Sequence, residues 1–323
     1  MLTFIVRRLL AAVLVMFVIT VIVFVIFFKT PGVDPARAIA GRNPSAQVIQ
    51  EIREQFGLDK PLPVQYGQMM KSIFISRDLV SYSNQGVKVV PEIAAATPAT
   101  LSLVFGAAII WVVMAIAIGV AAALLRGTLF DPLLMVLALI GVSAPVFWVG
   151  QVANMITQGG LHSTFLFSWV PPLGYTPFTQ DPLLWFKGLV IPWITLSILY
   201  IGLYGRVLRA NILETQTEDF VRTARAKGIT ERQVLLRHTL RTSMITFVSL
   251  FGLDFGALVA GGALLTEVVF GIHGVGFLAY QGFINLDLPT IMATVVYGAF
   301  FIVLVNALVD IAYAWLDPRI RPT

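Results

Sequence analysis

Long apolar segments alternate with polar ones along the 323 residues of the chain. Six segments hold at most one charged residue, and each approaches or exceeds the roughly 20 residues that a helix needs to cross about 30 Å of hydrocarbon. Because every backbone polar group must be satisfied inside a bilayer, we expect these segments to be helices. The predicted spans are 9–28, 99–125, 133–156, 188–205, 243–265 and 290–315.

The first apolar segment is predicted to be a membrane helix and not a signal peptide. A signal peptide has an apolar region of about 7–15 residues with a small-residue cleavage site close behind it. Here the segment runs from Leu9 to Phe28, and the nearest small-x-small run, Ala38-Ile39-Ala40, lies ten residues further on. Residues 1–29 are therefore assigned to a short cytoplasmic end and the first span.

Residues 30–98 form a polar region that we expect to lie outside the membrane. Within it, the spacing of apolar residues predicts a helix over 45–56 with Ser45 as N-cap, and a second helix near 66–75. The region is too short for a domain with a large core. Residues 99–323 then hold the other five spans.

Charge is scarce and unevenly placed. The chain is 58% hydrophobic and 12% charged, whereas soluble domains carry roughly 25% charged residues. Thirteen of the 22 Lys and Arg residues fall in segments that are cytoplasmic if the N-terminus is inside. The positive-inside rule thus predicts that both termini are cytoplasmic. It also accounts for the net charge of +5 without a nucleic-acid partner, and the surrounding partner is membrane lipid.

Few residues suggest chemistry within the chain itself. There is no cysteine and there are only three histidines, far apart in the sequence, so we expect no metal site. No paired catalytic carboxylates or nucleophile triad is evident, and no Gly-x-x-x-x-Gly-Lys-[Ser/Thr] phosphate loop occurs. We therefore expect no cofactor and no enzymatic activity in this chain.

The segment 206–242 is strongly basic and predicted to be cytoplasmic. It is expected to form two short helices with a turn at Gly228, because glycine suits the left-handed position after a helix and Thr230 can cap the next one. Small side chains at Ala224 and Ala226 permit another surface to approach closely. A basic loop that only sets the topology fits the composition equally well.

Polar residues within apolar spans are candidates for a transport pathway. Asp254 is the only acid deep in the fifth span, and Asn154 lies near the outer end of the third. Asp254 either lines a pathway, pairs with a partner chain or snorkels toward a loop, and for Asn154 a solvated rim at the outer end of the span is the favoured alternative to a pathway. A glycine-rich turn after the fifth span is predicted to be a re-entrant or capping segment at an outer mouth, with candidate residues Phe270, Gly271, His273, Gly274 and Gly276.

Several motifs spread over nearly the whole chain match one family as a set. They include Arg7-Arg8-Leu9-Leu10, 57–66, Pro98-Ala99-Thr100-Leu101, 143–148 and the C-terminal Asp317-Pro318-Arg319. The most specific motif is Arg222-Thr223-Ala224-Arg225-Ala226-Lys227-Gly228. Together they resemble the B-type permease subunit of dipeptide and oligopeptide (Dpp/Opp) ABC importers, and 222–228 is similar to that family's EAA loop. Arg222, Arg241 and Thr246 depart from the general pattern, as does His273 in place of a proline.

The resemblance implies an all-α membrane protein with six transmembrane helices and a type I importer (MetI-like) fold in a bacterial or archaeal cytoplasmic membrane. It implies that 222–228 is a coupling helix that docks on a separate ATPase subunit, where ATP and magnesium bind. The other implied partners are a second, C-type permease and an extracytoplasmic peptide-binding protein.

Other functions stay open at this level. Importers of nickel, glutathione or other small solutes share these motifs, and the substrate is not fixed by the sequence. An ion-driven secondary transporter predicts inverted repeats and several intramembrane acids. Neither feature is apparent, so this class is less favoured.

Overall fold

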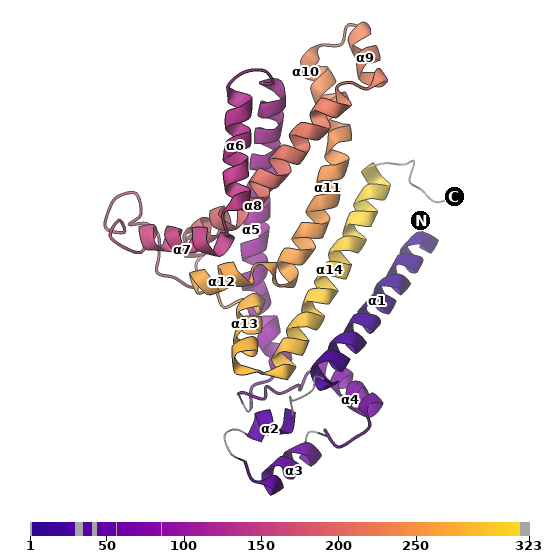
Figure 1. The fold of residues 1–323 in the computed structure, drawn as a ribbon, viewed down its shortest axis with the longest axis vertical. Coiled ribbons are helices and arrows are strands. Elements are labelled where there is room, and N and C mark those ends of the chain that lie inside the picture. The colour runs from indigo at the N-terminus through magenta and orange to yellow at the C-terminus, as the bar shows by residue number, and fades with distance from the viewer. Residues whose placement is uncertain (1, 30–34, 41–43, 56, 85, 317–323) are drawn as a thin grey trace.

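The chain is helical throughout the part that the structure describes. Figure 1 shows the computed structural model, which describes residues 2–29, 35–40, 44–55, 57–84 and 86–316. Within these residues the only extended pairing is an isolated antiparallel bridge between Val80 and Lys88. The expected all-α class is therefore confirmed.

Four continuous helices are each long and apolar enough to cross a membrane. They are α5 (Val89–Leu124), α8 (Pro182–Thr215), the composite helix Glu231–Gly262, and Leu288–Val309 within α14 (Leu288–Leu316). The first predicted span is also a helix, α1 (Leu2–Lys29), with a shorter apolar stretch over Leu10–Ile26. Two bent helix pairs bring the number of candidate spans in the described residues to as many as six.

The third predicted span, 133–156, is not one continuous helix. It divides into α6 (Phe130–Ser143) and α7 (Val146–Thr157), which meet at an angle of 95°. Pro145 causes the break, because proline has no N–H to donate and its ring keeps the preceding residue out of the helical region. Ala144 accordingly has an extended backbone with ψ of 127°.

The segment 206–242 is also not a long loop with two short helices. Residues up to Thr215 continue α8, and from Glu231 onward the chain belongs to the composite helix. The composite helix comprises α10 (Glu231–Gln233), the π-helical turn η1 (Val234–Thr239), α11 (Leu240–Ala257) and a second π-helical turn η2 (Leu258–Gly262). Only α9 (Asp219–Ala226) is a separate short helix.

The short helices gather at two opposite ends of the molecule. The α9 end carries α9 and α10, and the beginning of α1 and the end of α14 point toward it (Figure 1). The opposite end, here termed the α4 end, carries α2 (Pro35–Ala40), α3 (Ala46–Gln55) and α4 (Leu62–Phe74). As predicted, Ser45 caps α3, since its Oγ accepts a hydrogen bond of 3.3 Å from the N–H of Val48.

Helices α5, α6 and α8 pack closely on one another. Gly202 of α8 lies directly against the carbonyl of Ala138 on α6, so no side chain fits between the two backbones. At the α9 end of this pair, Arg209 donates two hydrogen bonds of 2.6 Å to the carboxylate of Asp131. Because α9 follows α8 in the chain, these contacts hold in place the end of α8 to which α9 is attached.

The α4 end is tied to the last helix by one buried carboxylate. Asp287, directly before α14, is 3% exposed. It accepts hydrogen bonds from the hydroxyl of Ser81 (2.6 Å), the N–H of Tyr82 (2.8 Å) and the hydroxyl of Thr290 (2.6 Å). The region between the first two spans is thus held against the membrane-spanning core by hydrogen bonds as well as by apolar packing.

Candidate functional site

Helix α9 presents a polar face outward and a small apolar face inward. Val221 and Ala224 are buried and pack with Val234 of η1 and Ile229. Of the seven predicted coupling residues 222–228, all except Ala224 are exposed. Ala224 is therefore used within the chain, whereas Ala226 and the basic residues Arg222 and Lys227 face outward.

Gly228 ends α9 in the way that the sequence predicts. Its φ is +76°, in the left-handed region. The N–H of Gly228 bonds to the carbonyl of Arg225 (2.9 Å), and the N–H of Ile229 bonds to the carbonyl of Ala224 (3.3 Å), which is the Schellman arrangement. Thr230 occupies the predicted N-cap position of α10, but its side chain makes no capping hydrogen bond.

Arg225 connects α9 to the helices on either side. Its guanidinium donates to both carboxylate oxygens of Glu231 on α10, at 2.8 and 3.2 Å, and to the carbonyl of Gln216 at 3.4 Å. The pair of Arg222 and Asp219, at 3.4 Å, is largely exposed and contributes little. Arg225 therefore sets the orientation of α9, and the other cations are available to a partner.

A recess opens beside α9. It has a volume of about 230 Å³ and is lined by residues of α9, α10 and η1 and of the ends of α5 and α8. Thr239 is one of its lining residues, and the hydroxyl of Thr239 is buried and has no hydrogen-bond partner among the described residues. Its lining combines apolar side chains such as Leu124 and Leu235 with charged ones such as Glu231, which suits a side chain inserted from outside.

Asp254 is bound by a side chain of a neighbouring helix. The hydroxyl of Tyr204 on α8 donates a hydrogen bond of 2.7 Å to its Oδ2. Asp254 is partly exposed, whereas Tyr204 is fully buried among aromatic rings. The carboxylate thus lies at the border between the packed interior and an open side of α11.

Asn154 has a different environment from Asp254. It is 7% exposed, and its Nδ2 donates a hydrogen bond of 2.8 Å to the carbonyl of Val269 on α12 (Leu264–Phe270). The two predicted pathway residues, Asn154 and Asp254, therefore bind different partners, and no contact between them is observed among the described residues. Asn154 holds α7 to α12.

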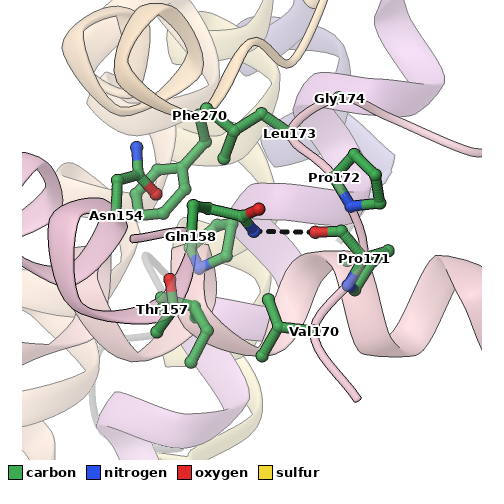
Figure 2. Close-up of a pocket in the computed structure, with 12 residues that line it drawn as sticks. Asn154, Thr157, Gln158, Val170, Pro171, Pro172, Leu173, Gly174 and Phe270 are labelled. Carbon is green, nitrogen blue, oxygen red and sulfur yellow. Dashed lines mark hydrogen bonds between the residues drawn. The ribbon is translucent and has the colours of Figure 1, made fainter. Parts of the chain in front are cut away.

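Figure 2 shows the small cavity beside Asn154. Side chains of α7, the segment 170–174 and Phe270 surround it, and Gln158 donates a hydrogen bond of 2.8 Å to the carbonyl of Pro171 across it. Its volume of about 10 Å³ is close to that of one water molecule. Asn154 Oδ1 is buried without a partner in the described residues, and this cavity is far too small for a peptide.

The predicted outer-mouth turn joins α12 to α13 (Val275–Asn285) at an angle of 90°. Gly271 has a φ of +64° and ends α12, and Phe270 is buried. His273 is exposed and its ring lies edge-on to that of Phe277, with centroids 4.5 Å apart. Gly274 and Gly276 are buried, which distinguishes them from the exposed part of the turn.

A buried acid, Glu267, explains why the two later glycines lie inside. Its Oε1 accepts a hydrogen bond of 2.6 Å from Thr100 of α5, and its Oε2 accepts one of 2.8 Å from the N–H of Phe277. Glu267 is 0% exposed. A side chain at Gly274 would meet its carboxylate at 2.5 Å. This acid was not singled out from the sequence, although a lone glutamate beside an apolar, glycine-rich turn is a usable signal.

Comparison with known proteins gives the family. Residues 115–322 match the model of the binding-protein-dependent transport system inner membrane component, and residues 1–104 match the N-terminal model of the same type of membrane component. The chain belongs to this permease family. Its predicted location as a multi-pass membrane protein is thereby confirmed, and its membership of the Dpp/Opp-type ABC permeases is confirmed by these matches together with its relatives named for peptide, dipeptide and glutathione transport.

Relatives of this permease match over almost their full length. A Brucella abortus (strain 2308) protein named for peptide transport is 36% identical, with 98% of each chain covered. The Escherichia coli (strain K12) permease DdpB, named for D,D-dipeptide transport, is 36% identical, with 95% of this chain and 94% of that one covered. The glutathione permease GsiC of Salmonella paratyphi A is 35% identical, with 99% of each covered.

The fold of the permease is also found in a solved structure. A chain of an inward-facing MetNI methionine ABC transporter aligns with a TM-score of 0.53 and 17% identity. The alignment covers 70% of the permease and 96% of the MetNI chain. The MetI-like fold that the resemblance implies is confirmed. For the described residues of the permease, no group of three or more His, Cys, Asp or Glu side chains is arranged to hold a metal ion.

Proposed function

We propose that this permease forms half of the translocation pathway of an ATP-driven importer for di- and oligopeptides. The full-length similarity to permeases named for peptide and D,D-dipeptide transport carries the proposal. Glutathione is the second candidate substrate, because GsiC is 35% identical over 321 residues. Glutathione is itself a tripeptide, so the two candidates differ in the peptide that is accepted and not in the chemical class.

The proposed partners follow from what a binding-protein-dependent permease requires. ATP hydrolysis needs a separate ATPase, since the sequence has no phosphate loop of the Gly-x-x-x-x-Gly-Lys type. A second, homologous permease supplies the other half of the pathway, and an extracytoplasmic binding protein delivers the peptide.

Helix α9 is proposed to be the coupling helix that docks on the ATPase. Three features support this role: its outward cations, the attachment of its base through Arg225, and the recess beside it. A helix that is anchored at both ends transmits a displacement to α8 and α11 instead of absorbing it. The α9 end is then cytoplasmic, as the distribution of Lys and Arg predicts, and the α12–α13 turn faces the outside.

The first experiment is to purify the tagged permease in mild detergent and identify by mass spectrometry what purifies with it. A second permease and an ATPase are expected with the wild type. Gly228→Pro is expected to lose the ATPase and keep the second permease, because proline cannot adopt a φ of +76°. Gly127→Ala is the matched control, since Gly127 also has a positive φ, of +84°, but lies in the α5–α6 turn.

Two outcomes would contradict the proposal. If the permease purifies alone under conditions that preserve the complex of a known relative, the importer assignment fails. If Gly228→Pro retains its ATPase, the assignment of α9 as coupling helix fails, while the importer assignment stands. Peptide and glutathione uptake by reconstituted vesicles then decides between the two substrates.

A further inference from the structure

One side of α11 is exposed near both ends of the helix, and its residues differ in kind from those on the exposed side of α6. The exposed residues of α11 are Arg241, at the first turn of the helix, and then Thr242, Ile245, Thr246, Leu253 and Ala257. By contrast, five of the eight exposed residues of α6 are large and aliphatic: Leu133, Val136, Leu137, Leu139 and Ile140. An aliphatic face suits lipid, whereas a face with hydroxyls and a small side chain suits a water-filled pathway or a protein partner.

Asp254 borders this open face of α11. It follows the exposed Leu253 and lies one turn before the exposed Ala257. Tyr204 binds Oδ2, while within the described residues Oδ1 accepts no hydrogen bond and no cation forms an ion pair with the carboxylate. An ionised carboxylate within a membrane span is costly unless it is hydrated or paired. Oδ2 of this carboxylate is therefore held in place by Tyr204, and Oδ1 is available to accept a hydrogen bond from a ligand.

Tyr204 cannot easily move away from Asp254. Its ring lies edge-on to Phe247, with centroids 4.9 Å apart, and tilted against Trp111 at 5.9 Å. Trp111 in turn stacks on the partly exposed Tyr200 at 4.6 Å. These rings fix the direction of the Tyr204 hydroxyl, so they also fix the direction in which the free oxygen of Asp254 points.

We propose that the free carboxylate oxygen of Asp254 binds a protonated amine of the transported solute, with Tyr204 as its positioning residue. This rests on the proposed function as a peptide importer. The amine is either the amino terminus of a peptide or a lysine side chain, and both offer the same charged N–H donor. The partly exposed Tyr200, whose ring is tilted against that of Tyr204 with centroids 6.3 Å apart, adds an aromatic group near Tyr204 that favours a cation.

The test uses the complete transporter, reconstituted with its partner subunits in vesicles. Trialanine and N-acetyl-trialanine are supplied together, and the ratio in which they accumulate is measured by mass spectrometry. This ratio reports the ratio of kcat/KM for the two peptides. Because the binding protein is the same for every variant, its own preference cancels when a variant is compared with the wild type.

Asp254→Asn is expected to lower the ratio of free to acetylated trialanine about tenfold, which corresponds to roughly 1.4 kcal/mol. Tyr204→Phe keeps the charge and removes only the positioning hydrogen bond, so a smaller change in the same direction is expected. Leu253→Ala, on the same open face, is the control and is expected to leave the ratio unchanged. An N-acetylated tripeptide ending in lysine shows whether a side-chain amine is also accepted.

A fall in uptake that is equal for both peptides in Asp254→Asn would overturn the proposal, because it indicates a structural role or an ion pair with the second permease. If Asp254→Asn does not assemble with its partner subunits, Tyr204→Phe becomes the deciding variant. An unchanged ratio of free to acetylated trialanine in Tyr204→Phe would then also overturn the proposal. Failure of the proposed function looks different: the wild-type transporter then accumulates neither peptide.

Discussion

Thr100 on α5 donates a hydrogen bond of 2.6 Å to the carboxylate of Glu267 on α12, 167 residues away in the chain. The same hydroxyl accepts a hydrogen bond of 2.8 Å from the N–H of Val275 at the start of α13. One threonine and one glutamate thereby join three helices at the α12–α13 turn. The turn is held by these polar groups, so its position depends directly on that of α5.

Removal of the Glu267 carboxylate is expected to destabilise the permease. Glu267→Ala leaves the Thr100 hydroxyl and the Phe277 N–H buried without an acceptor, at a cost of roughly 1–3 kcal/mol for each group. The melting temperature of the purified protein is the measurement. Glu218→Ala, at an exposed site before α9, is the control and is expected to change little. Equal melting temperatures for both variants would contradict the role of Glu267.

Glycine is expected to be required at 274 and unnecessary at 67. A Cβ at Gly274 would lie 2.5 Å from both Glu267 Oε1 and Thr100 Oγ1, so Gly274→Ala must displace the buried hydrogen bond and lower the melting temperature. At Gly67, within α4, nothing lies within 4 Å of an added Cβ. Gly67→Ala is therefore expected to stabilise by about 0.5–1 kcal/mol through helix propensity. A lower melting temperature in Gly67→Ala and an unchanged one in Gly274→Ala would contradict both expectations.

The ion pair of Asp131 and Arg209 is expected to contribute more than that of Asp219 and Arg222. Side-chain exposures are 10% and 24% in the first pair and 97% and 68% in the second. Loss of one partner in the buried pair leaves a charge without its counter-ion, which costs several-fold more than the roughly 0.2–1 kcal/mol of an exposed pair. Double-mutant cycles measured by denaturation in detergent compare the two coupling energies, and similar values for both pairs would contradict the prediction.

The approach of α11 to α14 is expected to depend on Gly252. An added Cβ there would overlap with the side chain of Val309, whereas at Gly256 the nearest atom is 3.4 Å away. Gly252→Ala is expected to destabilise by about 1–3 kcal/mol, since overpacking forces neighbouring groups to shift. Gly256→Ala is the matched control on the same helix. Rescue of Gly252→Ala by Val309→Ala is the further check, and its absence would locate the strain elsewhere.

The local interactions at the ends of short helices could largely be predicted from the sequence alone. Gly228 has the predicted left-handed conformation and Ser45 the predicted capping role, because both depend on residues within one turn of the chain. Thr230 reaches its predicted position without the expected hydrogen bond, since its carbonyl, and not its hydroxyl, accepts from Gln233 and Val234. The coupling role of 222–228 stays a prediction until the ATPase is tested.

The sequence by itself determined that the chain is a helical membrane permease, where most of its spans lie and to which family it belongs. Transfer of apolar side chains into lipid is nearly additive along the chain, so composition over about 20 residues is sufficient for the spans. Tertiary structure decided the rest: the burial of Asn154 against α12, the Tyr204–Asp254 hydrogen bond and the position of Glu267. Each of these brings together residues that are distant in the sequence or depends on what packs around a helix. No local pattern encodes such contacts, because a polar group in a membrane is stable only where a partner from another segment happens to satisfy it.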